Sequence, residues 1–246
     1  MRKFFFAEYA IVIRMEYLEN IVEYYDELYP IGAEQSTFFD ALLEDYADPV
    51  KVLRVGCGTG TYEHALARKG FDVTGIDSCH EFIDKAIRRR RLPNEAIRFF
   101  QMTAAEIGRF LAKDFYRCIM VLEGFIYFIR DPVLLRKFFY DCRGALTQNG
   151  VLVLHLPDIM PVRESMRVKL ISTVKEDADG FCTLTQTLEH GNSETLPVRT
   201  DVVIHIPSTQ ELSAYAKEAG FGSVNFYKDW NKEPCRAEEA SIWVLR

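Results

Sequence analysis

Three glycines at alternate positions interrupt a short apolar run, VLRVGCGTGT, at residues 52–61. Gly56, Gly58 and Gly60 permit a tight turn and let backbone approach a ligand closely. A helix that begins after such a loop favours a negatively charged group at its N-terminus. Asp77 ends the next apolar run, and a carboxylate there can accept hydrogen bonds from both hydroxyls of a ribose. Together these residues predict a site for a ligand that resembles a nucleotide.

Two classes of cofactor combine a ribose with a glycine loop. The fingerprint for dinucleotides has glycine or alanine three residues after its second glycine. Counted from Gly58, that position is Thr61, and the observed spacing is G-x-G-x-G. This departure disfavours NAD, so a nucleotide-dependent oxidoreductase is the weaker alternative.

Two side chains are candidates to take a proton from an acceptor. Glu123 follows the apolar run FYRCIMVL, and His155 lies near the end of VLVLHL. Each has a competing role: Glu123 as a contact for a cofactor amine, and His155 as a buried core histidine. His205, on a later strand-like run, is interpreted first as a sheet-surface residue and second as a contact for the acceptor. No nucleophile–base pair or metal triad emerges, so we assign no catalytic residue and expect no metal.

Alternating strands and helices are expected to position these residues. The patterns predict strands over 51–57, 71–77, 96–100, 115–122 and 150–156, and helices over 61–70, 80–90, 104–112 and 131–146. Alternation over about 100 residues indicates a parallel sheet with helices on both faces. Glu123 is then expected at a strand end that faces the ligand cleft.

The pattern changes on both sides of this region. Apolar residues at helical spacing predict a helix over 16–28, a second helix follows over 36–46, and residues 1–48 are interpreted as an N-terminal helical cap. Three strand-like runs predict an antiparallel insertion over 160–206, either a lid for the acceptor or a dimer surface.

The chain is predicted to close with one helix and two strands. Ser208 and Glu211 match the capping box of a helix that Gly220 ends. The last two strands complete a seven-stranded sheet whose last strand is antiparallel. We therefore expect a single doubly wound α/β domain over residues 1–246.

Bulk properties exclude several classes of partner. The chain has a formal net charge of −6, which argues against nucleic acid as a partner. No apolar run is long enough to span a bilayer, and no small-residue cleavage site follows the N-terminus. The six cysteines lack C-x-x-C spacing and suit a reducing compartment. We expect a cytoplasmic monomer or homodimer, with Met1 or Met15 as its start.

The stretch VLRVGCGTGTYEHALARKGFDVTGIDSCHEFIDKA resembles the cofactor half of class I S-adenosylmethionine-dependent methyltransferases that act on small molecules. The similarity continues in FYRCIMVLEGFIYFI and GALTQNGVLVLHLPD and covers most of residues 20–246. The resemblance implies a Rossmann-like methyltransferase fold, S-adenosylmethionine as cofactor, and methyl transfer to an unidentified small-molecule acceptor.

The resemblance also implies a role for each residue that matches the family's motifs. The glycine loop would lie along the methionyl group, Asp77 would bind the ribose, and Glu123 would lie near the reacting methyl. The residues implied to bind the cofactor are Tyr25, Gly56, Cys57, Gly58, Gly60, Asp77, Ser78, Phe82, Thr103, Ala104, Leu122 and Glu123.

Three positions depart from the family's pattern, because Arg54, Thr103 and Tyr116 stand where acids are usual. Arg54 matters most, since a cation near a sulfonium is repulsive. We expect its side chain to turn away, either to an acid such as Glu63 or to solvent. The missing acids leave a second alternative: a protein of the same fold that binds S-adenosylmethionine or S-adenosylhomocysteine without catalysis.

Overall fold

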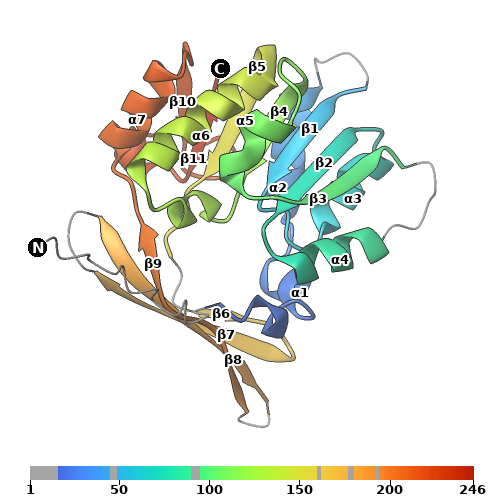
Figure 1. Cartoon of the computed structure of the whole chain (residues 1–246), viewed down its shortest axis with the longest axis vertical. Helices are drawn as coiled ribbons and strands as arrows, with labels where there is room; N and C mark the ends of the chain where they lie inside the picture. Colours follow the sequence, from blue (N-terminus) through green and yellow to red (C-terminus); the bar gives the residue numbers. More distant parts are fainter. Residues whose placement is uncertain (1–15, 45–48, 90–94, 160–161, 177–179, 192–193) are drawn as a thin grey trace, which may run out of the picture.

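This computed structural model describes residues 16–44, 49–89, 95–159, 162–176, 180–191 and 194–246. Seven strands form its main sheet (Figure 1). Their order is β10-β11-β5-β4-β1-β2-β3. Their bounds are β1 (Lys51–Val55), β2 (Asp72–Asp77), β3 (Ile97–Gln101), β4 (Tyr116–Val121), β5 (Leu146–His155), β10 (Val224–Tyr227) and β11 (Ile242–Leu245). Strands β1 to β5 pair in parallel, whereas β11 is antiparallel to both β5 and β10. The predicted seven-stranded sheet with an antiparallel last strand is confirmed.

Helices cover both faces of the main sheet. They are α2 (Ala33–Leu43), α3 (Thr61–Arg68), α4 (His80–Arg88), α5 (Ile107–Phe110), α6 (Pro132–Ala145) and α7 (Thr209–Glu218). Side chains of β1 alternate between two apolar clusters: Val52 packs with α2 and α3, whereas Leu53 and Val55 pack with α5, α6 and α7. The alternation puts Arg54 on the α3 face, which matters for the site.

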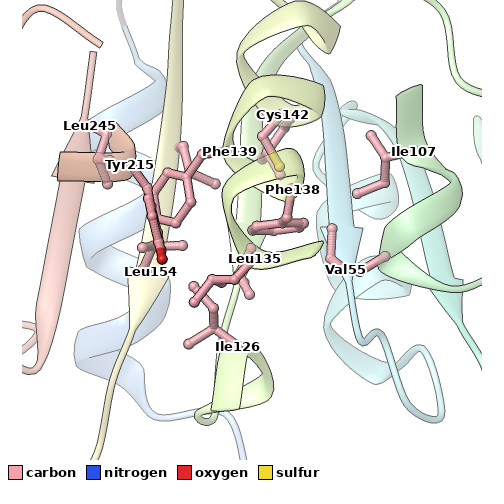
Figure 2. Packing of buried hydrophobic residues seen from close by; sticks show 14 of the residues in the cluster. Val55, Ile107, Ile126, Leu135, Phe138, Phe139, Cys142, Leu154, Tyr215 and Leu245 are labelled. Atoms are coloured by element: carbon pink, nitrogen blue, oxygen red, sulfur yellow. The ribbon is translucent and has the colours of Figure 1, made fainter. Parts of the chain in front are cut away.

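Local sequence signals determine where α6 and α7 begin; these are the two longest helices on the face of the main sheet that also carries α5. Asp131 accepts hydrogen bonds from the amides of Val133 and Leu134, and Pro132 occupies the first turn of α6. Ser208 accepts a hydrogen bond from the amide of Glu211 at the start of α7. Figure 2 shows the buried face of α6 between the sheet and its neighbouring helices. Full burial of each large apolar side chain there contributes about 1.5–3 kcal/mol.

A second, antiparallel sheet follows β5 along the chain. It contains β6 (Val162–Glu164), β7 (Val168–Glu176), β8 (Phe181–His190) and β9 (Thr195–His205), in that order. Three of these strands were predicted, and the expectation of only three is wrong. β6 has three residues, too few to show alternation, and its pairing with β7 defines it. Figure 1 shows this sheet apart from the main sheet, joined to α7 through β9.

The N-terminal segment is not the single helix predicted over 16–28. It forms the 3-10 turn η1 (Leu18–Asn20) and the short helix α1 (Tyr25–Leu28). The Tyr17 amide donates to the carbonyl of Val198, and the Asn20 side chain donates to that of Pro197. Tertiary contacts with β9 therefore override helical periodicity here. Residues 1–15, including both predicted start positions, lie outside the described residues.

The position of His205 corrects another prediction. This side chain is buried, not exposed on the sheet surface. Its ring stacks on Phe181 at 4.8 Å, and Nε2 lies 3.6 Å from Oε2 of Glu211. The end of β9 is buried because Cys182 and Ile204 of the second sheet pack into the core of the main sheet.

All six cysteines are free thiols, and five of them are buried. No helix within the described part of the chain is long and apolar enough to cross a membrane.

Candidate functional site

The glycine loop joins β1 to α3 and needs glycine for two reasons. Gly56, Gly58 and Gly60 have φ angles of 70°, 55° and 73°, in the left-handed region. A β-carbon at Gly56 would lie 2.3 Å from Phe125, and one at Gly58 would lie 2.6 Å from Tyr25. The backbone of the loop therefore forms a surface that aromatic rings, or a ligand, can approach closely.

Asp77 holds the glycine loop from the end of β2. Its Oδ2 accepts a hydrogen bond of 2.9 Å from the amide of Gly58, and its Oδ1 accepts one of 2.9 Å from that of Cys79. Burial raises the pKa of Asp77, and these hydrogen bonds oppose the rise. Each carboxylate oxygen retains a second lone pair, so Asp77 can also accept hydrogen bonds from the hydroxyls of a ligand.

Helix α1 covers the glycine loop. The ring of Tyr25 lies over Gly58, stacks on Tyr29 at 4.7 Å and lies 4.8 Å from the ring of Phe82. Burial raises the pKa of the Tyr25 phenol far above its usual value, so the hydroxyl stays protonated. Tyr25, Gly58, Asp77 and Phe82, all predicted from the sequence, thus lie together.

Asp26 attaches α1 to the loop. Its carboxylate accepts hydrogen bonds from the hydroxyls of Thr59 and Thr61 and from the guanidinium of Arg89. Burial alone would raise its pKa, but these three partners lower it. Sequence reasoning missed this contact, because Thr59 lies 33 residues away along the chain.

Arg54 lies beneath the glycine loop and is only 7% exposed. Its Nε lies 3.4 Å from the carbonyl oxygen of Gly56 and 3.9 Å from Oε1 of Glu63. Burial raises the pKa of Glu63 to about 7, and Arg54 opposes the rise. The prediction that Arg54 turns to Glu63 is confirmed, and its alternative, extension to solvent, is wrong.

Glu123 lies two residues beyond the end of β4 and has a φ angle of 56°, which is strained for a residue with a side chain. Its Oε2 accepts a hydrogen bond of 2.8 Å from Arg163, and its Oε1 lies 3.4 Å from Nδ1 of His155. Burial alone would raise the pKa of Glu123, but His155 and Arg163, with a weaker effect of Arg54, lower it to about 2. Glu123 is therefore a fixed negative charge across the neutral pH range.

Arg163 of β6 ties the second sheet to this edge of the main sheet. It binds Glu123, donates to the carbonyl of Leu28 at 3.4 Å, and lies 4.2 Å from the ring centroid of Tyr29. No local sequence pattern pointed to Arg163, since its partners are 40 and 135 residues away along the chain.

Other residues that the resemblance implies for the cofactor lie next to Asp77. The carbonyl of Asp77 accepts a hydrogen bond from the amide of Met102, which precedes Thr103. The Thr103 hydroxyl donates to Glu106 at 2.8 Å and caps η2 (Ala104–Glu106), so it already has a structural role. The other residues of this set are Ser78, whose carbonyl accepts from Gln101, and the buried Phe82, Ala104 and Leu122.

The donor set fits a cationic ligand that carries a ribose. Asp77 offers carboxylate oxygens at the loop, and Glu123 offers an ionised carboxylate at the neighbouring strand end. The charge of Arg54 is partly offset by Glu63. Across the residues that the structure describes, no group of three or more His, Cys, Asp or Glu side chains could hold a metal ion.

Comparison with known proteins agrees with this geometry. A family model described as a methyltransferase domain matches residues 52–150, which span the glycine loop, Asp77, Glu123 and the start of β5. A putative methyltransferase of Geobacillus sp. (strain WCH70) is 24% identical over 249 residues, covering 93% of this chain and 98% of the relative.

Solved structures show the same fold at low sequence identity. The CcbJ methyltransferase from Streptomyces caelestis superimposes with a TM-score of 0.73 at 17% identity, over 92% of this chain and 94% of that one. CalS10 from Micromonospora echinaspora, an amino pentose methyltransferase solved with S-adenosylmethionine bound, gives 0.68 at 16% identity, over 92% and 95% of the two chains. The expected Rossmann-like architecture is confirmed.

Proposed function

We propose that this chain is a class I S-adenosylmethionine-dependent methyltransferase that methylates a small-molecule acceptor at the carboxyl edge of its main sheet, which the match of residues 52–150 to a methyltransferase domain supports. One observation carries the proposal. Asp77 holds the left-handed glycine loop beneath Tyr25, and the ionised Glu123 lies at the end of a nearby parallel strand. Carboxyl ends of parallel strands are where ligands bind in open α/β sheets.

We assign the cofactor contacts to the residues that surround this edge. Asp77 would accept hydrogen bonds from the ribose hydroxyls, Tyr25 would cover the methionyl group, and Glu123 would lie near its amine and sulfonium. The remaining contacts would come from Gly56, Cys57, Gly58, Gly60, Ser78, Phe82, Thr103, Ala104 and Leu122.

The elements that cover the carboxyl edge of the main sheet favour a small acceptor. Arg163 links the second sheet to Glu123, and Asp26 links α1 to the glycine loop, so both elements cover the edge. A macromolecular surface would have to displace them. The net charge of −6 also disfavours nucleic acid. The CalS10 protein, similar in fold, is described as an amino pentose methyltransferase, which agrees with a small acceptor.

The chemistry divides between cofactor and protein. The bound cofactor supplies an activated methyl group and its own leaving group. The protein aligns the acceptor and excludes water, which is the work of α1, Tyr25 and the second sheet. Glu123 has a pKa of about 2, so it holds a charge in place and does not take up a proton near neutral pH.

The test is to follow the transferred group. Purified protein would be incubated with S-adenosylmethionine labelled in its methyl group and with a cell extract separated by ultrafiltration into small-molecule and macromolecular fractions. We expect label to enter the small-molecule fraction. Label found only in protein or nucleic acid, or no transfer to either fraction, would contradict the proposal.

A further inference from the structure

The inner face of the second sheet is apolar except along one rung. Residues that alternate toward this face are buried on each strand. They are Val168 and Leu170 on β7, Cys182, Leu184 and Leu188 on β8, and Val198 and Ile204 on β9. Ser172 and Gln186 interrupt this pattern, are also buried, and pair with each other in register. Gln186 pairs in turn with Arg199 of β9. We call Ser172, Gln186 and Arg199 the polar rung.

The polar rung is a connected hydrogen-bond network. The Gln186 amide donates to the Ser172 hydroxyl at 2.9 Å, and Arg199 Nη1 donates to the Gln186 side-chain carbonyl. The β8–β9 register shifts on both sides of Gln186, and such bulges commonly re-aim a side chain. Burial of polar groups costs free energy unless they are paired, so an apolar rung would serve the fold at least as well.

The polar rung lies between the two apolar contacts that hold the second sheet in place. On β8, Cys182 and Leu184 pack with the core of the main sheet, whereas Leu188 packs with the N-terminal segment around Ile21 and Leu28. Gln186 lies between these two contacts. The rung therefore crosses the inner face between these two contacts, and the side chain of Gln186 also hydrogen-bonds to Tyr29 of the N-terminal segment.

Arg199 extends from the rung toward the cofactor edge. Its guanidinium carbon lies 4.7 Å from the ring centroid of Phe128, in the turn η3 (Phe125–Phe128) that follows Glu123. Burial raises the pKa of Asp77, and Arg199 is among the charges that oppose this rise, so it lies within electrostatic reach of the glycine-loop site.

Arg163 and Arg199 differ in how many of their side-chain donors already have a partner. Arg163 is committed to Glu123, Leu28 and the ring of Tyr29. Arg199 donates through Nε to the half-exposed Glu16 at 3.0 Å and through Nη1 to Gln186. Among the described residues, none accepts a hydrogen bond from its Nη2.

We propose that Arg199 binds a carboxylate group of the acceptor, and that Gln186 and Ser172 hold its guanidinium in position. A guanidinium presents paired donors that match the two oxygens of a carboxylate. The acceptor is therefore a small carboxylic acid whose methylated atom reaches past Phe128 toward Glu123. This assignment rests on the proposed function and adds the chemical class of the substrate.

The test uses the protein saturated with S-adenosylhomocysteine and a library of matched pairs, each a small carboxylic acid and its carboxamide. Saturation-transfer NMR would detect binding. We expect some acids to bind where their amides do not, and Arg199→Gln to weaken those acids about 10- to 100-fold. Arg199→Lys should retain part of the binding, because it keeps the charge and loses the paired donors.

Two further variants make the result specific. Gln186→Leu extends the apolar face of β8, so it should fold and still weaken acid binding by releasing Arg199. Arg88→Gln removes an arginine of α4 whose side chain is 77% exposed, and it should leave binding of the acids unchanged.

Amides that bind as well as acids, no binding by either, or acid binding unchanged in Arg199→Gln would each overturn the assignment. Loss of S-adenosylhomocysteine binding by the unmodified protein would instead refute the proposed function.

Discussion

Asp77 combines a structural and a binding role in one carboxylate. Its two oxygens accept hydrogen bonds from the amides of Gly58 and Cys79, which shapes the glycine loop. The same oxygens are the expected partners of the ribose hydroxyls. Because an acid at a strand end after a glycine loop is a local pattern, this residue was predictable from sequence, as were the three glycines.

Replacing Asp77 should weaken cofactor binding more than it weakens the fold. For Asp77→Asn we expect S-adenosylhomocysteine affinity to fall by about 1.5–3 kcal/mol, the range for hydrogen bonds to a charged group. Isothermal titration calorimetry measures this directly. Asp84→Asn, at an exposed carboxylate on α4, is the matched control. Equal affinities in the two variants would remove Asp77 from the site.

Glu63 should give the protein a stability that depends on pH. Its pKa is raised from 4.5 to about 7 in the fold, chiefly by burial. Between these values the unfolded chain has lost the proton that the folded chain retains, so stability falls as pH rises from about 4.5 to 7, by at most about 3 kcal/mol. Glu63→Gln should lack this component. Denaturant unfolding of both proteins at pH 5 and pH 8 measures it, and parallel pH profiles would contradict it.

Site residues could be predicted from the sequence where their partners are close along the chain, and could not be predicted where the partners are distant. Alternation along β1 placed Arg54 on the α3 face, and Glu63, in the first turn of α3, was the nearest acid to consider. Arg163 and Asp26 had no such local signal. Their roles depend on how the second sheet and α1 fold back over the glycine loop.

At the scale of elements, α1 depends on its neighbours. A helix of four residues is not stable alone, because helix nucleation is costly. Its position over the glycine loop comes from Asp26, from Tyr25 and from the burial of Leu28. Periodicity over 16–28 predicted a longer helix because it reports which residues are buried and not what they pack against.

Removing the Asp26 carboxylate should loosen this cover. For Asp26→Ala we expect S-adenosylhomocysteine affinity to fall by about 1 kcal/mol, or about fivefold, since the hydrogen bonds to Thr59 and Thr61 are lost. The control is Asp40→Ala, which removes an exposed carboxylate of α2 that forms an ion pair with Lys69. Calorimetry on both variants decides, and an affinity for Asp26→Ala equal to that of the control would show that α1 does not cover the ligand.

At the scale of the whole molecule, the N-terminal segment and the second sheet share one apolar cluster. Ile21 and Leu28 pack with Val168, Leu188 and Val198, whereas the main sheet has clusters of its own. The sequence predicted both the parallel sheet and the antiparallel insertion, because each has a regular pattern. It did not predict that the insertion and the N-terminal segment pack together, because no local pattern encodes that contact.

The most direct test of the central claim is calorimetric titration of the 246-residue chain with S-adenosylmethionine and, separately, with NAD. A methyl-donor site at the glycine loop predicts saturable binding of S-adenosylmethionine at one site per chain, weaker binding in Asp77→Asn, and no heat of binding for NAD. Absence of S-adenosylmethionine binding, or NAD binding that Asp77→Asn weakens, would contradict it.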